Sequence, residues 1–110
     1  MKVYTARYRY KGKDRLDVTV KGEDPLGRAF APTWQMVKAL KAGLMTEDDY
    51  RESYIRMMRE SYRLFKDKWV KLLEMEEVTL VCYCEDGAFC HRYILAELLV
   101  KCGAEYLGER

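Results

Sequence analysis

The feature that most constrains the fold is the apolar run Val78–Cys84, in which hydrophobic residues follow one another with little polar interruption. Such a run is typical of a strand that is buried on both faces of a helix-covered parallel sheet. The segment after residue 90 has helical spacing, with apolar residues at Ile94, Leu95, Leu98, Leu99 and Cys102. Gly103 marks the end of this helix, and Ala104–Leu107 is expected to form a last strand. Because a strand–helix–strand unit joins parallel strands, we expect the last two strands to run parallel.

Two further strands are predicted near the N-terminus. Val3–Tyr10 alternates in polarity and is rich in residues that favour strands, and Lys11–Asp14 follows as a turn. Leu16–Val20 shows the same alternation over a shorter span. Residues 21–32 contain both prolines and are predicted to form a loop.

Helical patterns occupy the middle of the chain. Thr33 is placed to cap a short helix that ends at Gly43. Thr46–Asp49 resembles a capping box, and apolar residues at helical spacing continue from there to Leu73. An unbroken helix of this length would extend about 40 Å at the standard rise, which exceeds the diameter of so small a domain. We therefore expect a break between residues 59 and 68.

Length and composition limit the class of protein. The chain has 110 residues, 49% of them hydrophobic and 35% charged, with a net charge of +2, so one globular domain is expected. No apolar run is long enough to span a membrane, and the N-terminal residues lack the apolar core of a signal peptide, which favours a cytoplasmic protein. Few amide side chains and many Lys, Glu and Arg residues suggest a thermophilic source. The sequence therefore predicts a small three-layer α/β domain with a mostly parallel central sheet and helices packed on its faces.

The chemistry-bearing residues are concentrated in one segment, 82–92. It holds three of the four cysteines, the only histidine and an arginine. The segment leads from the C-terminal end of the buried strand into the next helix. Open α/β sheets bind ligands at this end, where free backbone N–H groups attract anions. We therefore place the candidate site here.

Each residue type in this segment suggests a role. Cys84 and Cys90 are candidate nucleophiles, and Cys90 is expected at the first helical turn beside His91 and Arg92, where the pKa of a thiol is lowered. His91 is suited to proton transfer near neutral pH. Arg92 is suited to hold a phosphate or carboxylate through two parallel hydrogen bonds. The sequence predicts no cofactor.

Less specific interpretations remain open for the same residues. Cys82 and Cys102 have the spacing of ordinary core residues. A zinc site would use Cys84, Cys90 and His91 with Cys82 as the fourth ligand, but the segment lacks the paired CxxC spacing that makes such assignments strong. A disulfide between Cys84 and Cys90 is the third alternative.

At these residues the sequence resembles the family known as domain of unknown function 488. Members carry a cysteine after an apolar strand and then a Cys-His-Arg triplet at the start of a helix, here Cys84 and residues 90–92, with Glu85 next to the first cysteine. The resemblance extends to residues 16–19, 30–33 and 108–109. It implies a small three-layer α/β fold. It also implies that Asp17, Thr19 and the loop through Arg28 and Pro32 line the same pocket as the cysteines, although Asp and Thr also brace loops in many proteins. In that pocket Arg28 would bind an anion together with Arg92, and Asp17, Thr19 and Glu85 would support the site.

Three functions are consistent with these observations. The first is an enzyme or ligand-binding domain that recognises a phosphate-bearing small molecule, a nucleotide or a nucleic-acid end. The second is a non-catalytic nucleic-acid binding module that uses the tyrosines and arginines of Val3–Tyr10, unless that segment is an edge strand with ordinary aromatic packing. The third is a structural protein braced by redox chemistry or a metal. No partner in a membrane is expected.

Overall fold

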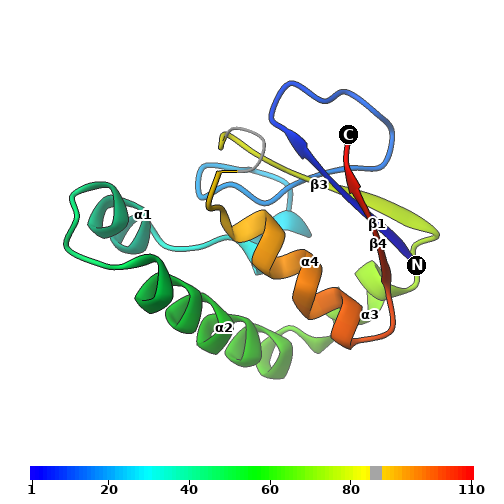
Figure 1. Cartoon of the computed structure of the whole chain (residues 1–110). Helices are drawn as coiled ribbons and strands as arrows, with labels where there is room; N and C mark the ends of the chain where they lie inside the picture. The colour runs from blue at the N-terminus through cyan, green and yellow to red at the C-terminus, as the bar shows by residue number, and fades with distance from the viewer. Residues whose placement is uncertain (85–87) are drawn as a thin grey trace.

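The central sheet has four parallel strands in the order β2-β3-β1-β4, within residues 1–84 and 88–110 that the computed structural model describes (Figure 1). The α/β class and the parallel sheet are therefore confirmed. The elements are β1 (Lys2–Arg7), β2 (Arg15–Asp17), the 3-10 helix η1 (Gly27–Phe30), α1 (Trp34–Lys41), α2 (Glu47–Leu64), α3 (Lys66–Leu73), β3 (Glu77–Cys82), α4 (His91–Lys101) and β4 (Glu105–Glu109).

The strand order differs from the simplest expectation in one respect. The strand–helix–strand unit β3-α4-β4 does join parallel strands, but β1 lies between β3 and β4 and pairs with both. Since β1 is an interior strand, the interpretation of Val3–Tyr10 as an edge strand is wrong. Each of the first three strands also ends two or three residues earlier than its apolar pattern. Those residues leave the ladder at the same edge of the sheet, where the candidate site lies.

The helix boundaries follow the local signals of the sequence. The Thr33 hydroxyl accepts a hydrogen bond from the backbone N–H of Met36 and so caps α1. Thr46 and Asp49 form the predicted capping box at the start of α2. The long helical pattern breaks at Phe65, between α2 and α3, within the interval expected from the size of the domain.

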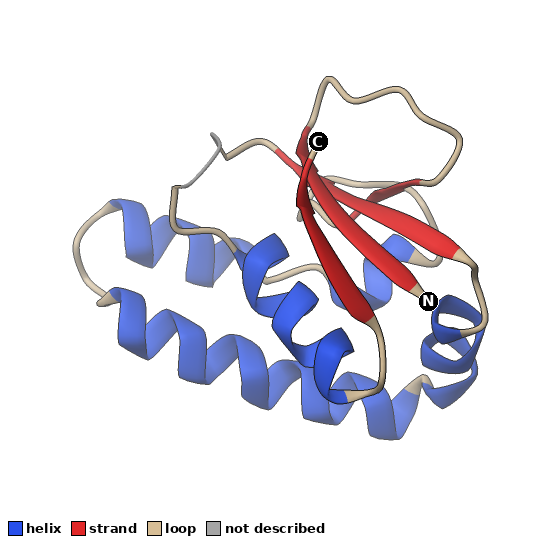
Figure 2. Ribbon diagram, turned by 45° about the vertical axis from the view of Figure 1, so that its right-hand side comes forward, coloured by secondary structure: helices blue, strands red, loops and turns tan. Residues whose placement is uncertain are grey.

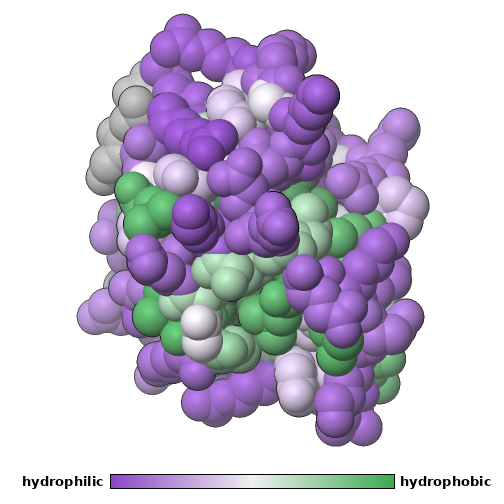
Figure 3. All heavy atoms as spheres, turned by 90° about the vertical axis from the view of Figure 1, so that its right-hand side faces the viewer, coloured by the Kyte–Doolittle hydropathy of each residue, from purple (hydrophilic) through white to green (hydrophobic). Residues whose placement is uncertain are grey.

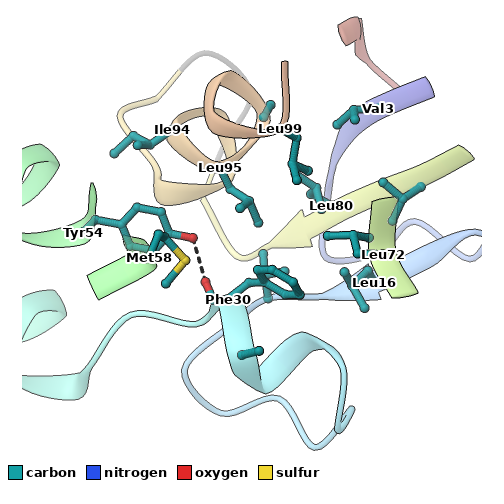
Figure 4. Close-up of a cluster of buried hydrophobic side chains, with 14 of the residues drawn as sticks. Val3, Leu16, Phe30, Tyr54, Met58, Leu72, Leu80, Ile94, Leu95 and Leu99 are labelled. Atoms are coloured by element: carbon teal, nitrogen blue, oxygen red, sulfur yellow. Dashed lines mark hydrogen bonds between the residues drawn. The ribbon is translucent and has the colours of Figure 1, made fainter. Parts of the chain in front are cut away.

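The described helices gather on one side of the sheet, and the segment between β1 and β2 lies on the other (Figures 1 and 2). One apolar core joins the sheet to all four α-helices. Figure 4 shows Leu80 of β3 facing Leu95 and Leu99 of α4, with Phe30 below them and Tyr54 at the left of the cluster. The hydroxyl of Tyr54 donates a hydrogen bond to the carbonyl oxygen of Phe30 over 2.7 Å, so this buried polar group is satisfied.

On the face that lies to the right in Figure 1, apolar side chains gather in the middle and hydrophilic ones surround them (Figure 3). Large apolar side chains that stay exposed on β4, α3 and α4 are Tyr106, Leu107, Val70 and Val100. Among residues 1–84 and 88–110, none of the helices has the length and apolarity needed to cross a membrane.

Candidate functional site

The predicted cysteine, histidine and arginine cluster assembles at the C-terminal edge of the sheet. Cys82 is the last residue of β3, Cys84 follows two residues later, and Cys90 is the N-cap of α4. His91 and Arg92 form the first turn of that helix. Cys84 is half-buried, whereas the other four residues are 6% exposed or less. All five residues thus lie together at this edge of the sheet, and four of them are buried.

Arg92 is the centre of this cluster. One terminal nitrogen of its guanidinium donates to the Cys82 Sγ and the Cys84 carbonyl oxygen, both at 2.9 Å, and lies 3.7 Å from the Cys90 Sγ. The other nitrogen donates to Glu109 Oε2 at 2.8 Å and to the Tyr93 hydroxyl at 2.9 Å. Burial alone would lower the pKa of Arg92, but the contacts with Cys82 and Glu109 raise it above its ordinary value. Arg92 therefore stays charged and holds the sulfurs, whereas the sequence suggested that it holds a ligand anion.

His91 is fixed by a backbone carbonyl. Its Nε2 lies 2.7 Å from the carbonyl oxygen of Val18, and because a carbonyl only accepts, Nε2 carries the proton of the neutral ring. Burial lowers the pKa of His91 below its ordinary value. The unprotonated Nδ1 faces the Cys90 Sγ at 3.8 Å. His91 is thus placed to accept a proton from Cys90.

The two candidate nucleophiles have opposite electrostatic surroundings. Hydrogen bonds from Cys82 and Cys90, together with the positive charge of Arg92, lower the pKa of Cys84 to about 3. Hydrogen bonding to the same two neighbours, Cys82 and Cys84, together with burial, raises the pKa of Cys90 above its ordinary value. The surroundings therefore shift the pKa of Cys84 toward the thiolate form and that of Cys90 toward the thiol form. Helix position alone had suggested the thiolate at Cys90.

A cavity of about 570 Å³ opens beside the thiols. Its walls include Trp34 from α1, Tyr50 from α2 and Phe89 from the segment before α4. The rings of Tyr50 and Phe89 meet edge to face, with centroids 5.5 Å apart. Lys21 and Lys41 also line the cavity, and the Lys21 ammonium lies 5.4 Å from the centre of the Trp34 ring. The volume is in the range of small-molecule sites.

Sequence reasoning missed this aromatic wall. Tyr50 has the spacing of a core residue, and Trp34 follows the Thr33 cap directly, on a helix too short to show which face is exposed. The one available signal is that Trp34 lies outside the apolar stripe of its helix, which begins at Met36. Single exposed aromatic residues are common on protein surfaces, so this signal alone does not identify a binding surface.

The loop after β2 borders the cavity, as the family resemblance implied, but its residues differ in role. Thr19 lines the cavity. Asp17 accepts hydrogen bonds from the backbone N–H and the hydroxyl of Thr19, at 2.9 and 2.6 Å. Arg28 is exposed and donates to the Val20 carbonyl oxygen at 2.6 Å. Asp17 and Arg28 therefore brace the loop that presents Thr19, and Glu85 lies outside the described residues.

The tyrosines of the first strand and the turn after it are engaged within the protein. The ring of Tyr8 stacks on Tyr83, with centroids 4.2 Å apart. The guanidinium of Arg110 lies 3.6 Å from the centre of the Tyr4 ring and donates a hydrogen bond to the Tyr10 hydroxyl. These faces are therefore already covered by protein side chains, and nucleic-acid binding by this strand stays a prediction.

A metal ion has one candidate set of ligands among the described residues. The Sγ atoms of Cys82 and Cys90 and a ring nitrogen of His91 lie within 4.8 Å of one another. His91 is also oriented by a carbonyl, as metal-binding histidines usually are. However, the guanidinium of Arg92 points at both sulfurs, and its charge opposes that of a cation. The described cysteines are free thiols, so the structure contains no disulfide between Cys84 and Cys90.

Comparison with known proteins identifies the family. The sequence profile of the family described as the active DUF488-N3 subclade matches residues 1–103. No curated protein and no solved structure matches the chain. The match includes the β3-loop-α4 segment with its Cys-His-Arg triplet and extends over nearly the whole chain. The chain therefore belongs to the domain of unknown function 488 family, in its active N3 subclade.

Proposed function

We propose that the chain is a thiol-dependent enzyme in which Cys84 is the nucleophile and the aromatic cavity holds the substrate. The observation that carries this proposal is the position of Cys84, which lines the cavity and is only half-buried, while Arg92 and two further cysteines surround it. A thiolate that is both stabilised and accessible is the property that distinguishes reactive cysteines from structural ones.

The neighbouring residues support this role without contacting the substrate. Arg92 balances the charge of the thiolate and holds the Cys84 carbonyl oxygen, which fixes the backbone of the nucleophile. Attack forms a bond between the Cys84 Sγ and an electrophilic centre of the substrate, and the leaving group departs with the electron pair of the bond that breaks. Cys84 is the catalytic residue in this proposal, and Arg92 is a positioning residue.

The lining of the cavity favours a flat anionic substrate. Trp34 and Phe89 offer ring faces and edges to an apolar or aromatic group. Lys21 and Lys41 are the charged side chains other than the cluster itself among the described residues that line the cavity. A phosphate-bearing small molecule, such as a nucleotide, carries both an aromatic ring and an anionic group. A nucleic-acid end carries the same two groups. Anion binding is thus assigned to these lysines, because Arg92 is engaged by protein groups.

The test is alkylation by iodoacetamide across pH 5 to 9, with each cysteine followed by mass spectrometry. The exposed Cys102 is the reference within the same molecule. The rate at Cys102 should rise about tenfold per pH unit below the free-thiol pKa of about 8.5, whereas the rate at Cys84 should stay nearly constant. A rate at Cys84 that follows that of Cys102 would contradict the proposal.

The substrate class is tested by protection in the same assay. AMP should slow the alkylation of Cys84 more than adenosine or inorganic phosphate does, and a 5′-phosphorylated oligonucleotide distinguishes a nucleic-acid end from a free nucleotide. The double variant K21Q/K41Q should weaken protection by AMP, and K13Q, far from the cavity, is the matched control. Equal protection by AMP and adenosine would show that the phosphate does not contribute to binding, and it would contradict the assignment of a phosphate-bearing substrate.

The free cysteines also bear on the cellular compartment of the protein. Free thiols persist in reducing compartments, and the four free cysteines favour the cytoplasm. The composition poor in amides supports a heat-adapted source. Fractionation of the native host and a thermal melt test these two expectations.

A further inference from the structure

Tyr83 lies at the mouth of the cavity, next to Cys84 in the chain. It is among the residues that line the cavity, yet it is 60% exposed. One face of its ring is covered by the ring of Tyr8, with centroids 4.2 Å apart and planes inclined by 18°. Because most of the residue stays exposed although that face is covered, the opposite face is open. Tyr83 therefore offers an open ring face at the cavity.

Exposure alone does not make Tyr83 a binding residue, since single exposed aromatic residues are common, but its ring has a fixed support. The guanidinium of Arg15 lies 4.5 Å from the centre of the Tyr8 ring, on the face away from Tyr83, because both groups cannot occupy one face at these distances. Arg15 donates hydrogen bonds to the carbonyl oxygens of Tyr8 and Tyr10, at 3.0 and 2.9 Å. The Tyr8 hydroxyl donates to Asp17 at 3.3 Å. The three side chains thus form a column in which each rests on the one before it, with Tyr83 at the open end.

The other aromatic side chains of the described lining are engaged by their neighbours. The ammonium groups of Lys21 and Lys38 lie 5.4 and 5.7 Å from the centre of the Trp34 ring. The ring of Phe89 meets that of a buried tyrosine of α2 edge to face. Among the described residues that line the cavity, Tyr83 is therefore the one best placed to present a whole ring face to a ligand.

We propose that Tyr83 is the stacking platform for the substrate and that the group it binds is the aromatic base of a nucleotide. An open face that is supported from behind fits a flat ring, and Lys21 and Lys41 on the same lining fit a phosphate. A ring that is already held in place loses little conformational entropy when a base stacks on it. The inference rests on the proposed function, because it takes the cavity as the substrate site. It names the residue that selects a ring-bearing substrate, and it does not depend on the ionisation of Cys84.

The experiment compares two ligands that carry the same phosphate. AMP has a base, and ribose 5-phosphate has none. Their Kd values are measured by isothermal titration calorimetry, with displacement of AMP for the weaker ligand. Y83L should weaken AMP by about five- to hundredfold, the loss expected when an aromatic side chain that stacks on a base is removed. The Kd of ribose 5-phosphate should stay the same, and Y83F, which keeps the ring, should bind AMP as the wild type does.

Two further variants test the support and the specificity of the effect. Y8L keeps the ring of Tyr83 but removes the ring behind it, so Tyr83 must be ordered when AMP binds. Ordering one side chain lowers affinity by about two- to tenfold, so the loss in Y8L should be smaller than that in Y83L. Y62L changes another exposed tyrosine, on α2 and outside the cavity lining, and should leave the Kd of AMP unchanged.

Stacking also has a spectroscopic readout. In the proton NMR spectrum, the H2 and H8 resonances of adenine should move upfield on binding to the wild type and to Y83F, because these protons enter the shielding region above the tyrosine ring. In Y83L the upfield shift contributed by this ring should be lost even at saturating AMP. Shifts that are the same in Y83L and the wild type would overturn the stacking assignment.

A 5′-phosphorylated tetranucleotide distinguishes a nucleic-acid end from a free nucleotide as the source of the base. Tighter binding of the tetranucleotide than of AMP identifies the nucleic-acid end, and weaker binding identifies the free nucleotide. In either case Y83L should weaken the tighter ligand.

The failures of the two proposals are distinguishable. If Y83L binds AMP as tightly as the wild type, or if it weakens AMP and ribose 5-phosphate equally, the platform is overturned and the phosphate-bearing substrate stands. If the wild type binds neither AMP nor the tetranucleotide, the platform and that substrate class fall together. The pH profile of alkylation at Cys84 then decides the nucleophile separately.

Discussion

The ion pair between Arg92 and Glu109 should contribute substantially to stability, and Glu109→Gln tests this directly. Arg92 is 0% exposed, and its guanidinium meets Glu109 Oε2 at 2.8 Å. The pair joins α4 to β4, which is an edge strand. Glutamine keeps the size of the side chain and one acceptor oxygen but removes the charge that balances the guanidinium.

The expected loss of stability in E109Q follows from how deeply Arg92 and Glu109 are buried. Breaking a fully buried ion pair typically costs about 3–5 kcal/mol, and a hydrogen bond to a charged group contributes about 1.5–3 kcal/mol. Glu109 is 22% exposed, so water screens part of the interaction. Arg92 also keeps its contacts with Cys82 and Tyr93. We therefore expect E109Q to lower the free energy of unfolding by about 2 kcal/mol.

Urea unfolding of the reduced protein at pH 7 measures this free energy, and E105Q is the matched control. Glu105 lies on the same strand but is exposed, so E105Q should change stability by less than about 0.5 kcal/mol. The slope with urea should stay the same in both variants. If E109Q and E105Q are equally stable, the reasoning from buried charge is refuted. Cys84 should still be alkylated rapidly in E109Q, because Arg92 remains beside the sulfurs.

Three further predictions follow from single contacts. Y54F should lower the free energy of unfolding by about 1–3 kcal/mol in urea, because the buried Phe30 carbonyl oxygen loses its donor, whereas Y62F at an exposed ring should not; equal stability would contradict this. Burial lowers the pKa of His91 in the folded protein. On acidification, this histidine is therefore protonated in the unfolded chain, near its ordinary pKa of about 6.5, before it is protonated in the folded protein. Stability is thus complete above that pH and falls by up to about 1.4 kcal/mol per unit on acidification, and H91Q should remove this part of the slope. Finally, protein purified in the presence of zinc should hold far less than one zinc per chain by emission spectrometry, because the charge of Arg92 opposes a cation; one tightly bound zinc would contradict the thiol interpretation.

Local sequence signals predicted the elements of this fold better than their arrangement. The run Val78–Cys84 identified a buried strand, and the caps at Thr33 and Thr46 located two helix starts, because each signal involves residues that are neighbours in sequence. The helix break at Phe65 was expected only because an unbroken helix would be longer than the diameter of the domain. The insertion of β1 between β3 and β4 was not predictable in this way, since periodicity shows which face of a strand is buried and not which strand lies beside it.

The candidate site shows the same difference between local sequence signals and the arrangement in space. The density of cysteine, histidine and arginine in 82–92 indicated a site in this segment, and the structure brings these side chains together beside a cavity. The role of Arg92 depended on Glu109, which is 17 residues away and reaches it only through the strand order of the sheet. Trp34 and Tyr50 reach the cavity from two other helices, through tertiary packing that one sequence does not reveal. The gathering of these side chains was therefore predictable from the sequence, and their contacts with distant residues were not.

The assignment of the thiolate to Cys84 is the point where competing energies decide the chemistry. A helix N-terminus stabilises a negative charge by about 0.3–1 kcal/mol, which alone would favour the N-cap residue Cys90. Two unit charges about 4 Å apart repel by about 4 kcal/mol at an effective dielectric constant of about 20, so sulfurs in contact do not ionise together. The single charge therefore settles where desolvation costs least, and Cys84 is half-buried whereas Cys90 is 4% exposed. The fold thus favours the negative charge on Cys84, and it favours the proton on Cys90, which lies next to His91.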